Sequence, residues 1–361
     1  MLLNLYLRVN LKEVPMNRSE LQKSLALLKY PDIDRTIKEL KLLGEVTVNN
    51  HVANIELLTV SDESYLSVKK LIEQNYSTKF KALNITKKTL GKKDTNYGDS
   101  ANPNNRAPYA KNIIAVTSGK GGVGKSTVSV NIAIALAQKG FKVGILDADV
   151  YGPNIPRLTN IDTERIKWGD NNKIIPAENY GLKIMSVALT TPKADTPLVW
   201  RSSVAVNALI QFLEDVDWGE LDFMVIDMPP GTGDVQLTMA QELPISAAVL
   251  VTTPQVVATD DVSRAIMMFK DINVPMAGVI ENMSFFIAPD TKNRYDIFGT
   301  DGGKRIAKKY DIPYLGEIPL DMQIREASDK GEPPVALGEQ NTKKYYKDIV
   351  NNILDTSEFK L

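Results

Sequence analysis

A glycine-rich stretch at residues 117–127 constrains the fold of this chain more than any other feature. It reads TSGKGGVGKST, and residues 119–126 match the pattern G-x-x-x-x-G-K-[ST]. An apolar run precedes the loop and a helix-forming run follows it, which is the strand–loop–helix context of a phosphate-binding loop. Glycines let backbone N–H groups turn toward phosphate oxygens, and the helix N-terminus adds a positive dipole end. The stretch therefore predicts a nucleotide site at the edge of a sheet.

The residues of this loop have separate expected roles. Lys125 is expected to reach the β- and γ-phosphates, and the Ser126 hydroxyl to ligate Mg²⁺. Lys120 is surplus, since a phosphate cradle needs only one lysine. It is either an exposed loop charge without a role or a second cation for the phosphates. The predicted nucleotide contacts in the loop are Gly119, Lys120, Gly121, Gly122, Val123, Gly124, Lys125, Ser126 and Thr127.

From residue 111 onward, short apolar strands alternate with helical stretches. The strands are β-branched and mostly lack polar alternation, as strands buried on both faces do. They read IIAVT, KVGIL, FMVID, AAVLVTT and MAGVIEN, and helical stretches such as 126–139 and 259–271 separate some of them. This order predicts an α/β fold with a mostly parallel sheet covered by helices on both sides.

The first third of the chain has a different pattern. Residues 1–85 predict a small α+β domain: an opening strand in MLLNLYL, a helix in 32–43, a hairpin around Asn49–His51, a helix in 63–74 and a strand in 80–85. Apolar residues nearly vanish over 86–110, which predicts a flexible linker. The nucleotide-binding domain is then expected over 111–361.

Polar residues follow three of the predicted strands where those strands end, the edge at which open α/β sheets bind ligands. Asp147 and Asp149 are candidate catalytic carboxylates beside Lys120 and Lys125. One would order Mg²⁺ through water and the other would orient or deprotonate an attacking water. Such Asp pairs can also be helix caps. The metal-binding set is then Ser126, Asp149 and Asp227. Asn282, after another strand, is a candidate partner for the adenine edge or a turn-forming Asn.

The composition of the chain excludes sites that need cysteine and argues against binding to nucleic acid or membranes. The chain has no cysteine and one histidine, so it holds no disulfide, thiolate metal site or catalytic thiol. A net charge of −1 argues against binding nucleic acid through bulk charge. No apolar run approaches the roughly 18–20 residues of a membrane helix. We therefore expect a cytoplasmic protein without a nucleic-acid or membrane partner.

Two motifs carry a resemblance to known families. The form K-G-G-x-G-K-[ST] resembles the deviant Walker A of the MinD/nitrogenase-iron-protein class, which implies a homodimer in which Lys120 contacts the phosphates of the neighbouring subunit. KGGVGKST, LDADVYGPNIPRL, DMPPGTGD and ENMSFF together resemble the Mrp/ApbC family of P-loop ATPases, known as iron–sulfur cluster carriers. The likeness covers 111–361. Residues 1–85 more weakly resemble the small MIP18-type domain that precedes the ATPase in many members.

This chain departs from the family at the cluster ligands. After N-M-S-x-F the family usually has C-P-x-C, which holds a [4Fe–4S] cluster between two subunits, whereas this chain has NMSFFIAPDTKNRYDIFG. Clusters are held by thiolates. One reading is thus an ATP-hydrolysing carrier that works through a cysteine-bearing scaffold or apo-target protein. The alternative is an ATP-switched, dimerising interaction protein of MinD type with no cluster role. A small-molecule kinase lacks an evident acceptor pocket.

Overall fold

The computed structural model describes nine segments of the chain, which forms two units, residues 1–94 and 95–361. The described residues are 16–30, 36–38, 42–59, 62–89, 106–169, 172–190, 202–338, 340–356 and 358–359. The strand expected in MLLNLYL lies outside them. Each unit is described by itself.

In its described residues, the N-terminal unit is a three-stranded sheet with two helices. Its elements are α1 (Arg18–Ala26), β1 (Leu43–Asn49), β2 (Val52–Thr59), α2 (Asp62–Tyr76) and β3 (Ala82–Thr89). β1 and β2 pair antiparallel and β2 and β3 parallel. Asn50 and His51 have φ values of 48° and 65°, and this left-handed pair makes the hairpin turn that the sequence predicts.

The helix expected over 32–43 is wrong in the part that the structure describes. Thr36 forms an isolated bridge with Lys29, and Leu43 opens β1 opposite Leu57. Ile37 is fully buried in the core of the unit and lies in a turn, not in a helix. Helix α1, which begins with a capping box between Asn17 and Glu20, is not among the predicted elements.

Ordered elements reach into both ends of the expected linker. β3 continues to Thr89. At the other end, the guanidinium of Arg106 lies 2.6 Å from the carboxylate of Glu214, and Ala107 is fully buried. The flexible character of the residues between them falls outside the described segments and stays a prediction.

The C-terminal unit is built on one eight-stranded sheet. The strand order is β15-β12-β11-β4-β10-β5-β9-β8, and all neighbours are parallel except β8, which runs antiparallel to β9. The strands are β4 (Ala110–Ser118), β5 (Val143–Asp147), β8 (Ala177–Asn179), β9 (Leu182–Ser186), β10 (Leu221–Asp227), β11 (Ala247–Thr252), β12 (Met276–Glu281) and β15 (Tyr314–Glu317). All five predicted apolar strands belong to this sheet.

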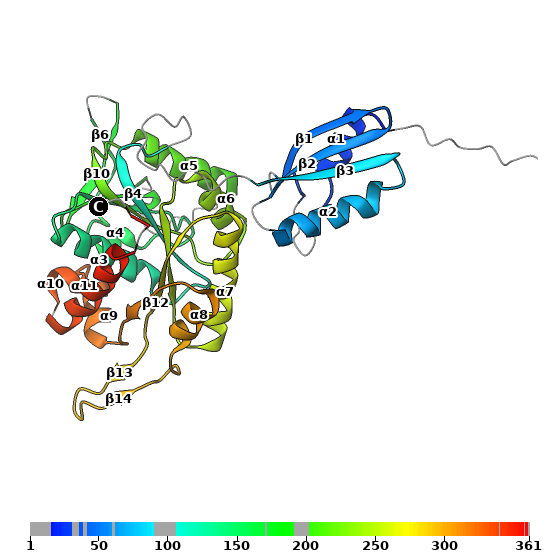
Figure 1. Cartoon of the computed structure of the whole chain (residues 1–361). Coiled ribbons are helices and arrows are strands. Elements are labelled where there is room, and N and C mark those ends of the chain that lie inside the picture. Colours follow the sequence, from blue (N-terminus) through cyan, green and yellow to red (C-terminus); the bar gives the residue numbers. More distant parts are fainter. Residues whose placement is uncertain are drawn as a thin grey trace, which may run out of the picture. The chain divides into compact units, whose positions relative to one another are not determined.

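Helices cover both faces of the sheet (Figure 1). One face carries α3 (Lys125–Gln138), α10 (Pro334–Leu337) and α11 (Gln340–Leu354); the other carries α5 (Ser202–Asp215), α6 (Asp234–Glu242), α7 (Val256–Asp271) and α8 (Gly302–Tyr310). The short helices α4 (Ile155–Leu158) and α9 (Met322–Asp329) pack on each other. Two ribbons, β6–β7 (Lys167–Trp168, Ile174–Ile175) and β13–β14 (Phe286–Ile287, Arg294–Tyr295), lie outside the sheet.

The C-terminal helix α11 packs on the domain through an apolar stripe. Ile349 and Ile353 are buried, and Tyr345 packs against the same core. Tyr346, one position further along, is also fully buried. Among the described residues, no helix has both the length and the apolarity that crossing a membrane requires.

Candidate active site

The glycine-rich loop joins the end of β4 to the start of α3 and depends on glycine at defined positions. Gly122 and Gly124 have φ values of 80° and 82°, a left-handed conformation that favours glycine. A Cβ at residue 119 would lie 2.1 Å from the carbonyl carbon of Asp261 in α7. Backbone therefore passes directly over backbone here. Left-handed glycines before a helix N-terminus allow backbone N–H groups to turn toward a bound phosphate.

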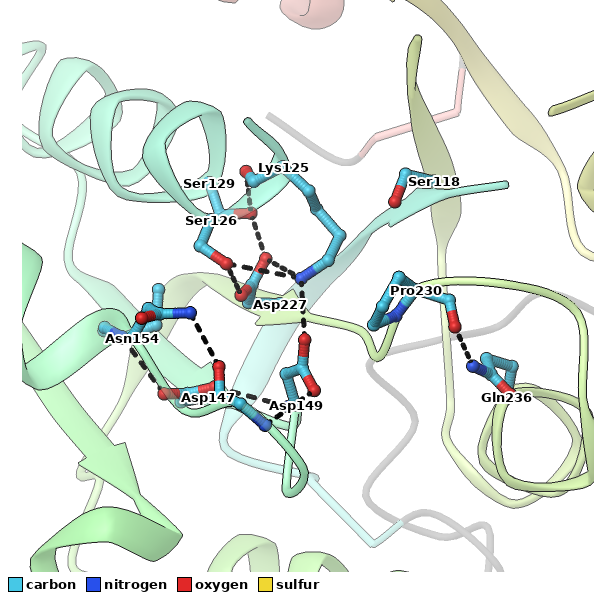
Figure 2. A network of polar contacts seen from close by, with 12 residues as sticks. Ser118, Lys125, Ser126, Ser129, Asp147, Asp149, Asn154, Asp227, Pro230 and Gln236 are labelled. Carbon is cyan, nitrogen blue, oxygen red and sulfur yellow. Dashed lines mark hydrogen bonds and ion pairs between the residues drawn. The ribbon is translucent and has the colours of Figure 1, made fainter. Parts of the chain in front are cut away.

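Lys125 and Asp227 form a buried ion pair at the centre of the site. The Lys125 Nζ lies 2.8 Å from Asp227 Oδ1, and the Ser126 hydroxyl donates to Asp227 Oδ2 at 2.7 Å. Figure 2 shows these three side chains converging below the first turn of α3. Because Asp227 is fully buried and Lys125 is 6% exposed, neither charge is solvated by bulk water. The predicted residues Lys125, Ser126 and Asp227 are thus brought together.

Ser129 is a member of this cluster that the sequence analysis missed. Its hydroxyl lies 2.6 Å from Asp227 Oδ1 and 3.0 Å from the Lys125 carbonyl oxygen. It stands three residues after Ser126 on α3, so both hydroxyls lie on the same face of the helix. That spacing was the available signal.

Asp149 approaches the same cation from the loop after β5. Its Oδ2 lies 3.8 Å from Lys125 Nζ, and its Oδ1 accepts from the Gly152 N–H at 3.3 Å. Burial raises the pKa of Asp149 while the Lys125 ammonium opposes that shift. A carboxylate that is nearly buried and beside Lys125, the lysine expected to bind phosphate, can accept a proton or hold a water.

Asp147, a candidate catalytic carboxylate in the sequence, does not line the cavity. Its Oδ2 accepts from the Ile155 N–H at 3.1 Å and the Ser186 hydroxyl at 3.0 Å, and its Oδ1 lies 3.3 Å from the Asp149 nitrogen. It is fully buried and is not part of the cavity wall. These contacts fit a residue that positions Asp149 and α4, which is the helix-cap alternative. A direct role in catalysis stays a prediction.

The electrostatic state of Asp147 follows from the sheet register. Asp147 and Asp227 are paired across β5 and β10. Burial, and then the negative charge of Asp227, raises the pKa of Asp147 to about 8. Two carboxyl groups on neighbouring strands cannot both ionise easily in a site shielded from water.

Lys120 lies in the cavity wall and is free of the carboxylate cluster. Its carbonyl oxygen accepts from the Ser118 hydroxyl at 2.9 Å. No carboxylate of the described residues pairs with its ammonium group. The loop after β10 closes on the same point, since the Gly231 N–H donates to the Ser118 carbonyl at 2.9 Å and Gln236 donates to the Pro230 carbonyl. Lys120 is therefore available to a phosphate or to a partner chain.

A cavity of about 480 Å³ opens beside the loop and extends well beyond it. Its near end is lined by Lys120, Lys125, Ser126, Thr127 and Asp149, together with Gly121, Gly122 and Gly124. The far wall comes from α4, the segment after β15, α9 and α11, and includes Asn154, Arg157, Leu158, Pro319, Leu320, Asp321, Ile324 and Tyr346. Of these far-wall residues, none is among the predicted site residues.

Asn282 and Tyr346 are two polar residues of the cavity wall. The Asn282 Nδ2 donates to the Val123 carbonyl at 2.8 Å, so this amide supports the glycine-rich loop. Its contact with adenine stays a prediction. The Tyr346 hydroxyl is buried and has no hydrogen-bond partner among the described residues. Burial raises its pKa, so it remains a donor at neutral pH.

The donor set of this site fits a hard cation. The Ser126 hydroxyl and the carboxylates of Asp149 and Asp227 are oxygen ligands of the kind that Mg²⁺ prefers. Within the described part of the chain, no three His, Cys, Asp or Glu side chains are grouped closely enough to hold a metal by themselves. Such a site suits a metal held partly by nucleotide phosphates.

Curated relatives are named as iron–sulfur proteins. An iron–sulfur cluster carrier protein of Aquifex aeolicus is 53% identical over 230 residues, 64% of this chain and 63% of that protein, so the match spans less than two thirds of its length. A carrier protein of Helicobacter pylori is 38% identical over 324 residues, 89% of this chain and 87% of that protein, and the match reaches into the N-terminal unit.

Solved structures and a family model agree with the architecture. A nucleotide-binding protein from Archaeoglobus fulgidus, solved with ADP, is 37% identical and has a TM-score of 0.59. The match covers 67% of this chain and 94% of that protein. The Pyrococcus furiosus cell-division ATPase MinD, 21% identical with a TM-score of 0.53, is covered to 98% by 68% of this chain and shares the fold. The ParA model described as NUBPL iron-transfer P-loop NTPase matches residues 109–354. The chain belongs to this family of P-loop NTPases.

Proposed function

We propose that this protein hydrolyses Mg-ATP as a homodimer and uses the cycle to act on iron–sulfur proteins that carry their own cysteines. The observation that carries the proposal is the convergence of Lys125, Ser126 and Asp227 at the phosphate end of a cavity large enough for a nucleotide. The near end fits the triphosphate, and the far wall fits the base and the ribose.

The reaction assigned to this site is transfer of the γ-phosphoryl group to water. The bond between the γ-phosphorus and the oxygen that bridges it to the β-phosphate breaks as a bond from the water oxygen forms. ADP leaves with the bridging oxygen, and the γ-phosphoryl group leaves as inorganic phosphate. Lys125 neutralises charge on the phosphates, and Asp149 orients the water and accepts its proton. Ser126, Asp149 and Asp227 would hold Mg²⁺, which supplies further charge neutralisation when bound. The Asp147 carboxylate supports Asp149 by accepting a hydrogen bond from the backbone N–H of Asp149.

The homodimer is proposed from the position of Lys120. Its ammonium has no carboxylate partner in the described segments and borders the cavity. A cation supplied from a neighbouring subunit stabilises transition-state charge as an arginine finger does. Each site would then be complete only when two chains meet.

The proposed clients follow from the names of the relatives and the composition of the chain. The relatives are carriers, but this sequence has no cysteine, so it offers no thiolate for a cluster. A cluster would be substrate bound to the partner protein. The cytoplasmic location expected from the sequence stays a prediction, which cell fractionation would test.

Two measurements on the purified chain test the proposal. Wild-type protein should release phosphate from Mg-ATP slowly, and Lys125→Ala should abolish release. Nucleotide binding without phosphate release would overturn hydrolysis. Unchanged release by Lys125→Ala would overturn the site.

Anaerobic reconstitution tests the cargo. With iron and sulfide alone, the wild-type chain should show no [4Fe–4S] absorbance. The variant Ala288→Cys/Thr291→Cys recreates the C-P-x-C spacing in the A-P-D-T stretch and should gain cluster absorbance. ATP should also raise the rate at which a cysteine-bearing scaffold passes its cluster to an apo-ferredoxin. No effect of ATP on transfer would favour the alternative, a MinD-like switch without a cluster role.

A further inference from the structure

The ends of β12 and β15 each carry a carboxylate next to residues that line the nucleotide cavity. On β12, Glu281 is followed by Asn282 and Met283 of the cavity wall. On β15, Glu317 is followed at short range by the wall residues 319–321. The cavity and the two carboxylates are thus neighbours along both chain segments.

The two carboxylates meet at one hydroxyl. The Ser284 Oγ lies 2.6 Å from Glu281 Oε1 and 3.1 Å from Glu317 Oε2. Glu281 is 1% exposed, and its other oxygen accepts from the Gly303 N–H at the start of α8. A buried carboxylate satisfied on both oxygens holds its neighbours in one arrangement.

Arg294 of the β13–β14 hairpin closes this cluster from outside. Its Nη1 and Nη2 lie 2.9 and 3.4 Å from the two oxygens of Glu317. Its guanidinium stacks 4.0 Å from the ring centre of Phe285, which in turn contacts Tyr345 of α11 edge-on at 6.1 Å. Bidentate and stacked contacts of this kind need arginine and a fixed geometry. We call Arg294, Glu317, Ser284 and Glu281 the hairpin latch.

Backbone bonds make the latch and the cavity wall one ladder. The Ile318 N–H donates to the Glu281 carbonyl at 2.9 Å, the Ser284 N–H to the Ile318 carbonyl at 2.9 Å, and the Leu320 N–H to the Phe285 carbonyl at 2.7 Å. Met283, inside this ladder, has a φ of 52°, a left-handed value unusual for methionine. A displacement of the hairpin latch therefore also displaces Met283 and the cavity wall to which it belongs.

The ladder ends on the glycine-rich loop. The Asn282 Nδ2 donates to the Val123 carbonyl at 2.8 Å, and a Cβ at residue 124 would lie 2.2 Å from that same nitrogen. The amide therefore packs against the loop where α3 begins. Any displacement of Asn282 changes the position of the N–H groups that would bind phosphate.

We infer that Arg294 and Glu317 are positioning residues for the nucleotide site and couple it to the β13–β14 hairpin. The inference rests on the proposed function, in that the cavity must take a nucleotide. With the latch closed, Asn282 holds the loop in its binding geometry. When the ion pair between Arg294 and Glu317 is broken, the site binds nucleotide more weakly. By reciprocity, bound nucleotide favours the closed latch.

Binding measurements on paired variants test this coupling. Arg294→Gln and Glu317→Gln should each weaken binding of a fluorescent ATP analogue by about threefold or more, although neither residue lines the cavity. Lys292→Gln removes an exposed charge from the same hairpin and is the matched control, with unchanged affinity expected. In an Asn282→Ala background, Arg294→Gln should lose its effect on affinity, since the route to the loop is cut.

Hydrogen exchange gives a second readout that a purely structural role would not move. In wild type, ATP should slow exchange of the amides in 286–295, and in Arg294→Gln it should not. A wild-type chain that binds no nucleotide would overturn the proposed function. A wild type that binds, with Arg294→Gln and Lys292→Gln equal in affinity and in exchange, would overturn the coupling alone. If Arg294→Gln fails to fold, Glu317→Gln and wild-type exchange decide.

Discussion

Lys125 Nζ lies 2.8 Å from Asp227 Oδ1 in a place where neither side chain is solvated. The same ammonium lies 3.8 Å from Asp149 Oδ2. A dashed line marks this ion pair in Figure 2. The cation that is expected to bind phosphate is therefore also the counter-charge of the carboxylates that would hold the metal. Phosphate binding and the stability of the site are linked through this one group.

Lys125→Ala should lose both functions. It leaves Asp227 buried without its cation, which costs about 3 kcal/mol in the free energy of unfolding. Nucleotide affinity should fall below detection in a fluorescence titration. Lys125→Met/Asp227→Asn removes both charges and should recover most of the stability without any binding. A double variant as unstable as the single one would show that the charge pair is not the cause.

Lys120→Ala should keep nucleotide affinity and lose most turnover, by a factor on the order of 10³ if the lysine acts as an arginine finger does. Mixed with Asp149→Ala, it should recover about one quarter of the wild-type rate, since random mixing makes half of the dimers mixed and each keeps one intact site. Phosphate release from the mixture measures this. Mixed dimers without activity would show that Lys120 does not act across subunits.

Asp147 predicts a pH dependence of stability in the nucleotide-free protein. Burial and then Asp227 raise its pKa to about 8 from the ordinary value of 3.8, so the folded state holds the proton more tightly than the unfolded chain does. The resulting stability is fully present below pH 4 and is lost as the pH rises toward and through 8. Asp147→Asn should flatten this decline in urea unfolding between pH 5 and 9.

Asp222 is the matched control for that experiment, because the shift of its pKa has the opposite sign. A hydrogen bond from Lys111 lowers the pKa of this carboxyl below 3.8. It therefore stays ionised in both the folded and the unfolded state from pH 5 to 9. Asp222→Asn should change stability by a constant amount over this range. Equal slopes in wild type and Asp147→Asn would refute the assignment to Asp147.

Tyr346→Phe should separate stability from binding. The hydroxyl is buried without a partner in the described part of the chain, so its removal should leave the protein as stable or raise the unfolding free energy by up to about 1 kcal/mol. If the hydroxyl donates to the nucleotide at the far wall, ATP affinity should fall by about fivefold. Calorimetry measures both quantities. Thr342→Val, a buried neighbour one turn earlier on α11, is the control and should leave affinity unchanged.

The sequence by itself determined the conformation of the glycine-rich loop. The spacing of glycines, Lys125 and Ser126 specifies a loop between a strand and a helix, because left-handed backbone and a helix N-terminus are local properties. All five predicted apolar strands belong to the eight-stranded sheet. They could be predicted because a strand that is buried on both faces has a continuous apolar sequence. The absence of cysteine likewise excludes thiolate ligands wherever the chain folds.

Only the tertiary structure decided which side chains lie in contact with one another. Asp147 and Asp149 look equivalent in sequence, yet the register of β5 with β10 buries Asp147 beside Asp227 and leaves Asp149 facing the cavity. Ile37 was expected in a helix, yet it is buried in the core of the N-terminal unit outside any helix, because burial outweighs local propensity. The pairing of Arg294 with Glu317 joins residues 23 positions apart and depends on the order of β12 and β15. Strand order is a long-range property, so no local pattern of residues encodes it.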